Sequence, residues 1–497
     1  MAIHKVCGME TEYGIHPIGP DPNPIAASSV LINAYVADMA RRVGWDFEDE
    51  SPGRDARGFA SEGAMPPKVD THLVNAVLTN GARYYVDHAH PEYSTPECAS
   101  ALEVVRYDKA GERILARSME AVERILPPGQ RIVVYKNNSD RKGNSYGTHE
   151  NYLMARTVPF TRVIRHIIPH FVSRQIYTGA GKVGAETDNA GAEVDYQLSQ
   201  RADFFEEEVG LETTLKRPIV NTRDEPHADA KKYRRLHVIV GDANLAEVAI
   251  LLKVGVTAIV LAMIEDDWFA VRGCDYTLAT PVPAMRQVSR DLSLSQPLEL
   301  ADGTSMTALE IQWELLDLAR KYTEDRGLAC VGGENDGPEV MRRWEATLSG
   351  LEVDPQSLSG QLDWVAKRSL VEGYRERHDL AWSDHRLAAI DLQYHDLRPA
   401  KSLFARMDTE RLVDEQSVVE AITEPPRDTR AYFRGKCLQR WASSIAAANW
   451  DSMVFDLGTD PLRRVPMMEP LKGTADHVGK LLESCTSPAE LLKRLGS

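Results

Sequence analysis

Stretches in which apolar and polar residues alternate occur through the first half of the chain, and such alternation predicts strands with one buried face. Apolar residues spaced three and four apart predict helices, above all between Met306 and His385. We expect strands at residues 3–16, 83–87, from 131, from 148 and from 234, and helices at 25–43, 71–79 and 108–125. Strands interleaved with long helices indicate an α+β protein with a largely antiparallel sheet.

The most apolar run extends from Val248 to Ile264. It contains Lys253 and Gly255 and is shorter than a membrane span requires, so it is predicted to be a buried helix. The N-terminal sequence MAIHKVCGMETEYG lacks the apolar core of a signal peptide. We therefore expect a protein without a membrane role.

Two breaks in the pattern suggest how the chain is organised. Residues 45–68, WDFEDESPGRDARGFASEGAMPPK, are rich in Gly, Pro and charge and have few apolar residues to bury. They predict a mobile insertion, which is either an ordinary surface loop or a lid over a site. A loop with Pro425 and Pro426 precedes a final segment from Asp428 to Ser497. We expect a large domain over residues 1–426 and a small C-terminal domain over residues 427–497.

The charge and the cysteine content argue against several kinds of function and site. The 497 residues include 58 basic and 74 acidic side chains, and the formal net charge of −16 argues against general nucleic-acid binding. The six cysteines are widely scattered and form no CxxC pair. A disulfide framework or zinc site is therefore disfavoured, and reduced thiols in a cytoplasm fit better.

Several predicted strands carry charged residues at period two, on a face that would be apolar if it were packed in a core. Glu10 and Glu12 share one face of the first strand, where two like charges repel unless solvent or a cation lies between them. Other strands repeat the pattern with Arg83, Tyr85 and Asp87, with His149 and Asn151, and with Arg235 and His237. Such a face suits Mg²⁺ and a triphosphate, because Mg²⁺ prefers oxygen ligands and Arg offers planar forks to phosphate.

A competing nucleotide motif is weak. GAGKVG, from Gly179 to Gly184, satisfies GxGxxG, but it follows no clear strand and no βαβ unit surrounds it. Val183 stands where a Walker A motif requires Ser or Thr after Lys182. We do not expect a nucleotide loop here.

Long motifs resemble the family of Pup ligases and Pup deamidases, and the resemblance runs through essentially the whole chain. They are GMETEYGI, YYVDHAHPEYSTPEC, YKNNSDRKGNSYGTHENYL and NTRDEPHADAKKYRRLHVIVGDAN. NSYGTHEN also resembles the N-G-x-G-x-H-x-[NH] pattern of glutamine synthetases, with Ser145 in place of the second glycine. The resemblance implies a glutamine-synthetase-like domain with a curved sheet, followed by a small C-terminal domain. It also implies ATP and Mg²⁺ as cofactors.

The family has two activities. One branch ligates the tag protein Pup to lysines with ATP, and the other deamidates the C-terminal glutamine of Pup and removes Pup from tagged proteins. The insertion at 45–68 resembles a loop of the deamidases, and DHAHPEY is one residue shorter than the DVGSHPEY of ligases. The resemblance thus implies a Pup deamidase and depupylase, with Pup and pupylated proteins as partners and bound ATP that is not consumed at each cleavage. The alternatives are an ATP-consuming ligase and a non-catalytic Pup-binding adaptor.

The resemblance also implies roles for single residues. Asp87 matches the catalytic position and is expected either to attack the side-chain carbonyl or to activate a water. The expected metal-binding residues are Glu10, Tyr85 and Glu92, with Glu12, His149 and His237 added by analogy with glutamine synthetase. The expected nucleotide contacts are Arg83, Thr95 and Trp450, whereas Arg223 and Arg235 are expected either to reach phosphates or to form structural ion pairs.

Pup is acidic, so its groove is expected to be locally basic despite the negative net charge. The candidate cations are Lys231, Lys232, Arg234, Arg427, Arg430, Arg434, Lys436 and Arg440.

Overall fold

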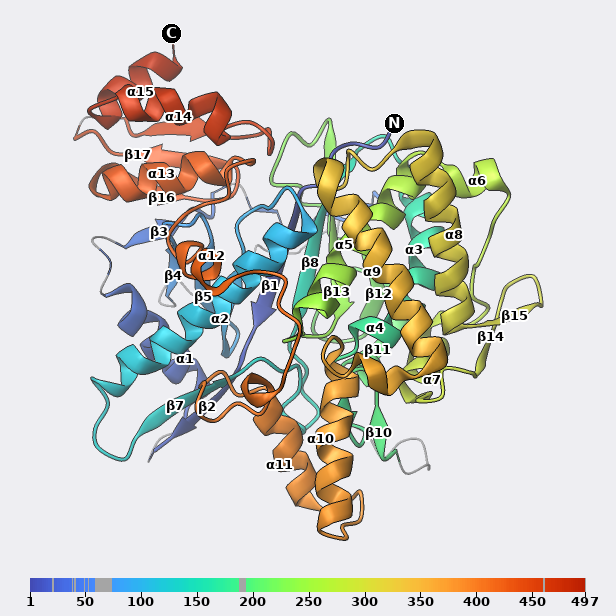
Figure 1. Ribbon diagram of the computed structural model, residues 1–497. Coiled ribbons are helices and arrows are strands. Elements are labelled where there is room, and N and C mark those ends of the chain that lie inside the picture. The colour runs from blue at the N-terminus through green and yellow to red at the C-terminus, as the bar shows by residue number, and fades with distance from the viewer. Residues whose placement is uncertain are drawn as a thin grey trace.

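The computed structural model describes residues 1–19, 22–37, 39, 42–48, 50–51, 53–58, 74–186, 194–458 and 461–496. A ten-stranded sheet runs through it in the order β13-β8-β1-β6-β5-β4-β3-β16-β17-β18 (Figure 1). In that order the strands are Tyr233–Gly241, Thr148–Ala155, Cys7–Glu12, His90–Ser94, Arg83–Asp87, Asn75–Val77, Val43–Trp45, Ile445–Ala448, Ser452–Phe455 and Arg463–Pro466. Over these described strands, all neighbours are antiparallel except β3 and β16. The predicted α+β class with a largely antiparallel sheet is confirmed.

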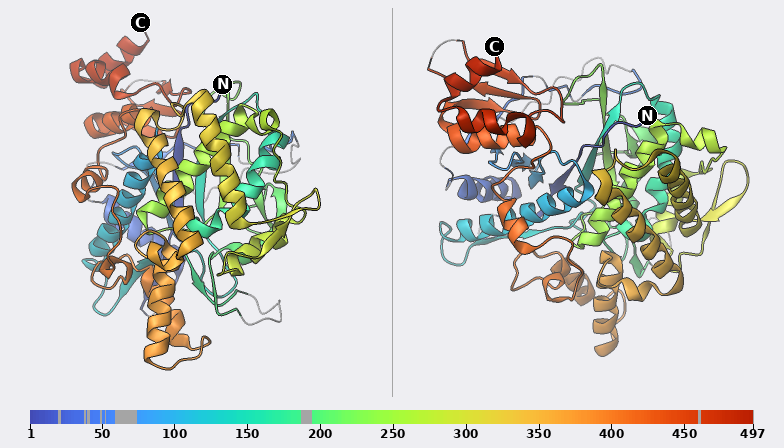
Figure 2. Two further views of the ribbon diagram at one scale, coloured as in Figure 1. Left: turned by 45° about the vertical axis from the view of Figure 1, so that its right-hand side comes forward. Right: turned by 45° about the horizontal axis from the view of Figure 1, so that its top comes forward.

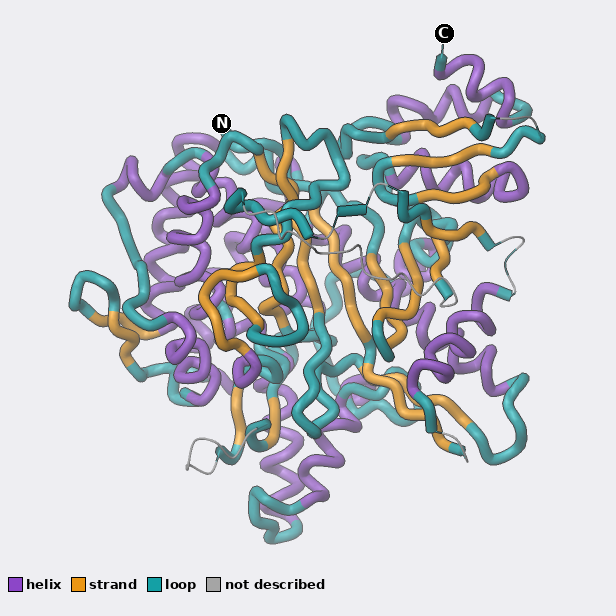
Figure 3. Tube along the Cα trace, turned by 180° about the vertical axis from the view of Figure 1, so that it is seen from behind, coloured by secondary structure: helices purple, strands orange, loops and turns teal. Residues whose placement is uncertain are grey.

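Helices cover one face of the sheet. α1 (Pro24–Val36) packs on β5 and β6, α2 (Ala101–Glu123) on β1, and α5 (Glu247–Glu265) on β8. Seen from behind in Figure 3, the strands lie nearer the viewer than these helices. The other helices are α3 (Phe160–Ser173), α4 (Gln175–Thr178), α6 (Trp268–Arg272), α7 (Pro281–Arg290), α8 (Ala308–Arg326), α9 (Gly333–Val353), α10 (Asp363–Arg377), α11 (His385–Tyr394), α12 (Glu415–Glu420), α13 (Ala431–Trp441), α14 (Ala475–Ser484) and α15 (Pro488–Leu495).

Shorter strands pair outside the main sheet. β2 pairs with β7, β9 with β10, β11 with β12, and β14 with β15. Their bounds are Gly14–Ile18, Arg131–Tyr135, Lys182–Val183, Tyr196–Gln197, Phe205–Gly210, Arg217–Asn221, Pro297–Glu299 and Ser305–Thr307.

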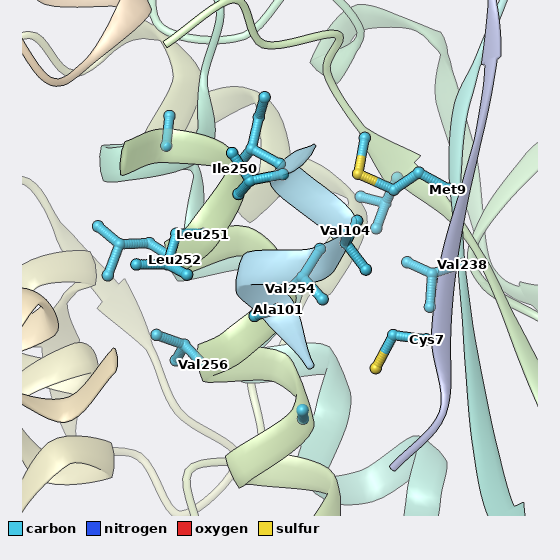
Figure 4. Close-up of a cluster of buried hydrophobic side chains, with 14 of the residues drawn as sticks. Cys7, Met9, Ala101, Val104, Val238, Ile250, Leu251, Leu252, Val254 and Val256 are labelled. Atoms are coloured by element: carbon cyan, nitrogen blue, oxygen red, sulfur yellow. The ribbon is translucent and has the colours of Figure 1, made fainter. Parts of the chain in front are cut away.

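The core lies between the sheet and its helices. Cys7 and Met9 of β1 point from the sheet toward Val104 of α2 (Figure 4). α5 packs behind α2, and the run from Glu247 to Ile264 is buried along its whole length, as predicted. Among the described residues α5 is also the helix long and apolar enough to cross a membrane, but that apolar stretch lies entirely inside the protein. Lys253 is accommodated there because its Nζ donates to the carbonyl oxygen of Asp242 at 2.7 Å.

Some of the predicted helices and strands are confirmed, and others are wrong. The strands expected from 131, 148 and 234 are confirmed as β7, β8 and β13. The helix expected at 25–43 is confirmed as α1 only as far as Val36, and Val43 already belongs to strand β3. The helix expected at 71–79 is wrong, because Asn75–Val77 forms strand β4. A short apolar run is ambiguous by periodicity, and here pairing with β3 on one side and β5 on the other decides its conformation. Residues 71–73 lie outside the described residues, as do residues 49, 52 and 59–68 of the predicted insertion.

GAGKVG has a packing role in the structure. Gly181 has φ +71°, and a Cβ there would lie 2.1 Å from the hydroxyl of Tyr196. Its carbonyl oxygen accepts a hydrogen bond from Nζ of the buried Lys367 at 2.6 Å. The segment is therefore closely packed and leads into strand β9, so it does not form a nucleotide loop.

The C-terminal segment lies at one end of the molecule (Figure 2), and its hydrophobic cluster includes Val43 and Trp45 of β3 and Val77 of β4. It is tied to the main sheet in two ways. The first is the parallel pair of β16 with β3. The second is a buried ion cluster in which Arg430 and Arg434 of this segment both pair with Glu97, which follows β6.

Arg434 lies at the centre of that cluster. Its side chain is fully buried and donates to the carbonyl oxygens of Gly81, at 2.8 Å, and Trp450, at 3.1 Å. Burial by itself would raise the pKa of Glu97, but the charges of Arg434 and Arg430 outweigh it and lower that pKa to about 2. A guanidinium so placed stabilises the docking of the C-terminal segment.

Several of the basic side chains expected to form a groove for Pup do not form one. Arg234, Arg430 and Arg434 are buried. Lys232 pairs with Glu469, and Lys436 pairs with Glu424. The sequence shows where the cations cluster. It does not show the carboxylates, distant along the chain, with which these cations pair.

We predict that Arg434→Met lowers the free energy of unfolding by about 3–5 kcal/mol, because it leaves Glu97 buried with half of its ion pairing. Chemical denaturation followed by tryptophan fluorescence measures the change. Arg463→Met, on the exposed strand β18, is the control and should unfold like the wild type. Equal stability of the two variants would contradict the proposed role of the cluster.

The ion pair of Glu97 with Arg434 also predicts that the free energy of unfolding depends on pH. The pKa of Glu97 is about 2 in the folded protein against an ordinary value of 4.5, so its stabilisation is complete above pH 4.5 and is lost as the pH falls toward 2. Arg434→Met should therefore lose less stability than the wild type over this range in an acid titration of the unfolding free energy.

Candidate active site

The face of the sheet opposite α1, α2 and α5 gathers the charged side chains predicted from the period-two pattern. Residues directly opposite each other on neighbouring antiparallel strands have Cβ atoms about 4.5–5.5 Å apart, so register brings their side chains together. The facing pairs are Glu10 with His149, Glu12 with Glu92, Glu92 with Tyr85, Asn151 with His237, and Arg83 with Ser94. Five adjacent strands thus contribute to one polar patch.

A first cluster consists of Glu10, His149 and His237, whose ligand atoms lie within 4.8 Å of one another. Asn151 orders it: its Nδ2 donates to Glu10 Oε1 at 2.8 Å, and its Oδ1 lies 3.0 Å from His237 Nδ1. Arg235 NH1 also lies 3.2 Å from His237 Nδ1, so Asn151 and Arg235 together fix the orientation of this ring. Burial, followed by the charge of Arg235, lowers the pKa of His237 well below its usual value, which keeps the imidazole neutral.

The carboxylate of this cluster is ionised. Burial alone would raise the pKa of Glu10, but the hydrogen bond from His149 and the charge of Arg235 hold it well below the ordinary range. A neutral imidazole beside an ionised carboxylate is a donor set that divalent cations accept.

A second cluster consists of Glu12, Asp87 and Glu92, again with ligand atoms within 4.8 Å. Glu92 is only 2% exposed. Burial, and then the charges of Asp87, Glu12 and Glu10, raise its pKa well above the ordinary value. Carboxylates that repel one another this strongly fit a hard divalent cation, which takes oxygen ligands.

Asp87 lies at the open side of this cluster, with its side chain 39% exposed. Burial tends to raise its pKa, but a hydrogen bond from His88 Nδ1 at 3.1 Å outweighs this and lowers it. The same contact raises the pKa of His88 to about 9. Asp87 is therefore an ionised carboxylate that a substrate can reach.

The two histidines of DHAHPEY have different surroundings. His88 adopts a left-handed backbone with φ 50° and turns its ring to Asp87. His90 Nδ1 instead bonds the carbonyl oxygen of Tyr13 at 3.0 Å, and its ring stacks on Tyr146. The pair thus shapes the turn beside Asp87.

A cavity of about 80 Å³, partly open to solvent, borders the first cluster. Its lining includes Glu10, Thr95, Asn151, Arg235, Arg430 and Trp450. Thr95 is buried, and its Oγ1 accepts a hydrogen bond from the amide of Met9 at 3.0 Å, which leaves the hydroxyl proton available. The cavity combines an aromatic ring with cationic side chains, which suits a nucleotide.

The two candidate phosphate-binding arginines differ. Arg235 has structural partners: its NH1 donates to Asn151 Oδ1 at 2.6 Å and lies 3.7 Å from Glu10 Oε1. Arg223 follows β12, and its buried Nε has no hydrogen-bond partner among the described residues. A buried guanidinium nitrogen without a partner is unfavourable and fits an anionic ligand.

Every residue on the predicted site list is described, and most lie on this face or around the cavity. Asn151 shared the period-two pattern with His149 in the sequence but was not selected, although it joins Glu10, Arg235 and His237. Trp45 was noted only as the start of the insertion, and no local signal marked its position beside the site.

Comparisons with known proteins agree with this picture. Residues 5–454 match the family model described as Pup-ligase protein. A depupylase of Acidothermus cellulolyticus is 55% identical over 99% of this chain and 99% of its own length. A Pup deamidase/depupylase of Mycolicibacterium smegmatis is 50% identical over 99% of this chain and 100% of its own length.

Solved structures show the same fold. The ligase PafA in its complex with the prokaryotic ubiquitin-like protein Pup is 32% identical, with a TM-score of 0.81, over 99% of this chain and 94% of that chain. The Pup ligase PafA in complex with ADP is 35% identical, with a TM-score of 0.74, over 82% of this chain and 89% of that chain.

We predict that Glu92→Gln stabilises the cation-free protein by about 1–3 kcal/mol at pH 7, because it removes an acid whose ionisation is opposed by close like charges. The folded-state pKa of Glu92 lies above the ordinary 4.5, so wild-type stability should fall as the pH rises above 4.5, and the variant should lack this loss. Thermal unfolding in EDTA measures both effects.

Added Mg²⁺ should raise the melting temperature of the wild type more than that of Glu92→Gln. Glu206→Gln, on the exposed side of β11, is the matched control and should respond like the wild type. A Glu92→Gln variant that is less stable in EDTA and equally stabilised by Mg²⁺ would contradict the repulsion argument.

Proposed function

The chain belongs to the Pup ligase family, and from this premise we propose that it is a Pup deamidase and depupylase. It hydrolyses the side-chain amide of the C-terminal glutamine of Pup to glutamate, and it cleaves the isopeptide bond that joins Pup to a lysine of a tagged protein. It is therefore a hydrolase acting on C–N bonds. Its partners are Pup and pupylated proteins.

The similarity to the two branches of the family supports this choice. Relatives named as depupylase and Pup deamidase/depupylase are 55% and 50% identical over almost the whole chain. The solved Pup ligases are 32% and 35% identical. An ATP-consuming ligase on the same fold is the alternative, and an adaptor without catalysis is disfavoured by the intact acidic cluster around Asp87.

The ionised and accessible carboxylate of Asp87 carries the proposal. Both reactions break a bond between a side-chain carbonyl carbon and nitrogen; water supplies the hydroxyl, and ammonia or the lysine amine leaves. Asp87 either adds to that carbon, with an anhydride hydrolysed afterwards, or takes a proton from the attacking water, and both routes need the deprotonated form. His88 holds that form by its hydrogen bond to Oδ2.

We also propose that ATP and Mg²⁺ are the cofactors. Glu10, Glu12, Tyr85, Glu92, His149 and His237 would hold the metal ions, and Arg83, Thr95, Arg223, Arg235 and Trp450 would hold the nucleotide. Bound cations would stabilise the negative charge that develops on the carbonyl oxygen. The nucleotide would lie between the large domain, residues 1–426, and the small one, residues 427–497, in a cytoplasmic enzyme.

We predict that Asp87→Asn lowers ammonia release from Pup ending in glutamine by at least about 100-fold, because the variant lacks the carboxylate that reacts. The assay contains ATP and Mg²⁺, and ADP is counted in the same tube. The wild type should release ammonia well in excess of ADP. Glu206→Gln is the control and should behave like the wild type.

Other outcomes would identify the alternatives. ADP formed in step with a Pup–lysine bond, without ammonia, would mean that the chain is a ligase. Binding of Pup and ATP with neither product would mean an adaptor. Ammonia release that survives Asp87→Asn would remove Asp87 from the centre of the reaction.

A further inference from the structure

The environment of Arg83 differs from that of the other buried cations. Its guanidinium lies 3.8 Å from the ring centroid of Tyr85 and 4.1 Å from that of Trp45, so aromatic rings flank it. Its Nε donates to Asn75 Oδ1 at 3.0 Å. No carboxylate among the described residues lies within ion-pairing distance of it. Its charge is therefore balanced by ring faces, and the edge of its planar fork is left for an anion.

Trp45 is held firmly in that position. It ends β3, which pairs with β4 on one side and with β16 on the other, where Trp45 faces Ala448. Its Nε1 donates to Glu50 Oε1 at 2.6 Å, and the ring is 6% exposed. The indole is fixed by the sheet on both sides and by its own polar atom.

The same indole contacts Trp450 from the C-terminal segment. The two ring centroids are 5.1 Å apart, with the planes at 70°, an edge-to-face arrangement. Arg434 lies 5.0 Å from the Trp450 ring. Trp450 lines the cavity with Glu10 and Thr95, so Trp45 touches two residues of the nucleotide site, Arg83 and Trp450, and supports both.

We infer that Trp45 is a positioning residue for nucleotide binding: it fixes the plane of Arg83 and the ring of Trp450 at the same time. The inference rests on the proposed function, because it takes Arg83 and Trp450 as nucleotide contacts. Trp45 also begins the stretch 45–68, so the root of the predicted insertion is part of the nucleotide site.

Two substitutions of Trp45 distinguish the effect of its aromatic face from the effect of its side-chain volume. Trp45→Leu fills the space with an apolar side chain but has no π face for Arg83, whereas Trp45→Phe keeps one. We expect Trp45→Leu to raise the Kd of a non-hydrolysable ATP analogue with Mg²⁺ about tenfold, and Trp45→Phe to raise it by less than about threefold. Isothermal titration calorimetry on the full chain measures both.

Trp441 offers a matched control in the same hydrophobic cluster. It is 9% exposed and has Arg440 stacked at 4.5 Å, but it does not line the cavity. Trp441→Leu should lower the melting temperature about as much as Trp45→Leu and leave the Kd unchanged. If Trp45→Leu does not fold, Trp45→Met is compared with Trp441→Met, because Met is larger than Leu and also lacks a π face. Equal Kd values in these two variants would overturn the inference.

The outcome also separates this inference from the proposed function. If Trp450→Ala and Arg83→Ala weaken binding while Trp45→Leu does not, only the role of Trp45 is overturned. If none of the three weakens binding, the nucleotide site itself is misplaced. A combined Trp45→Leu, Arg83→Lys variant that is no weaker than either single variant supports the inference, because both changes then disrupt the same stack.

Discussion

Mutual repulsion among carboxylates on one face of the central sheet is the constraint on which the rest of the site depends. Antiparallel register places Glu12 opposite Glu92, and Glu92 is buried beside Asp87 as well. A fold selected for stability alone would not place these groups together, because each ionisation makes the next more costly. The repulsion lies on the face opposite α1, α2 and α5, and a bound cation would relieve it.

The sheet continues into the C-terminal segment, and the cavity takes lining residues from both parts of the chain. Strand β16 extends the sheet beyond β3, which brings Trp450 to the cavity beside Glu10 and Thr95. Glu97 and Arg434 hold the junction with a buried ion pair instead of with apolar surface alone. Such a pair stabilises one arrangement and penalises others, since separating the parts would leave Glu97 and Arg434 uncompensated.

Much of the site could be predicted from the sequence because strand periodicity is a local property. Glu10 and Glu12 share a face wherever their strand pairs, and the same holds for Tyr85 and Asp87. Local patterns could not give the partners across strands. Nothing near Trp45 indicates that it meets Trp450, and nothing near Arg434 indicates its pairing with Glu97. Strand β4 was missed for the same reason, since its neighbours in the sheet, not its own three residues, determine its conformation.

The charges of this face are balanced in two different ways, and this bears on how an acidic chain can hold an acidic partner and a nucleotide. Arg430 and Arg434 are buried and share the carboxylate of Glu97, which offsets part of their charge. Arg83 lies between aromatic rings, which stabilise a cation without cancelling its charge. A net charge of −16 is thus compatible with local attraction for phosphate, because attraction depends on the few cations that have no carboxylate beside them. Counting basic residues along the sequence overlooks this distinction, and the surroundings of each guanidinium reveal it.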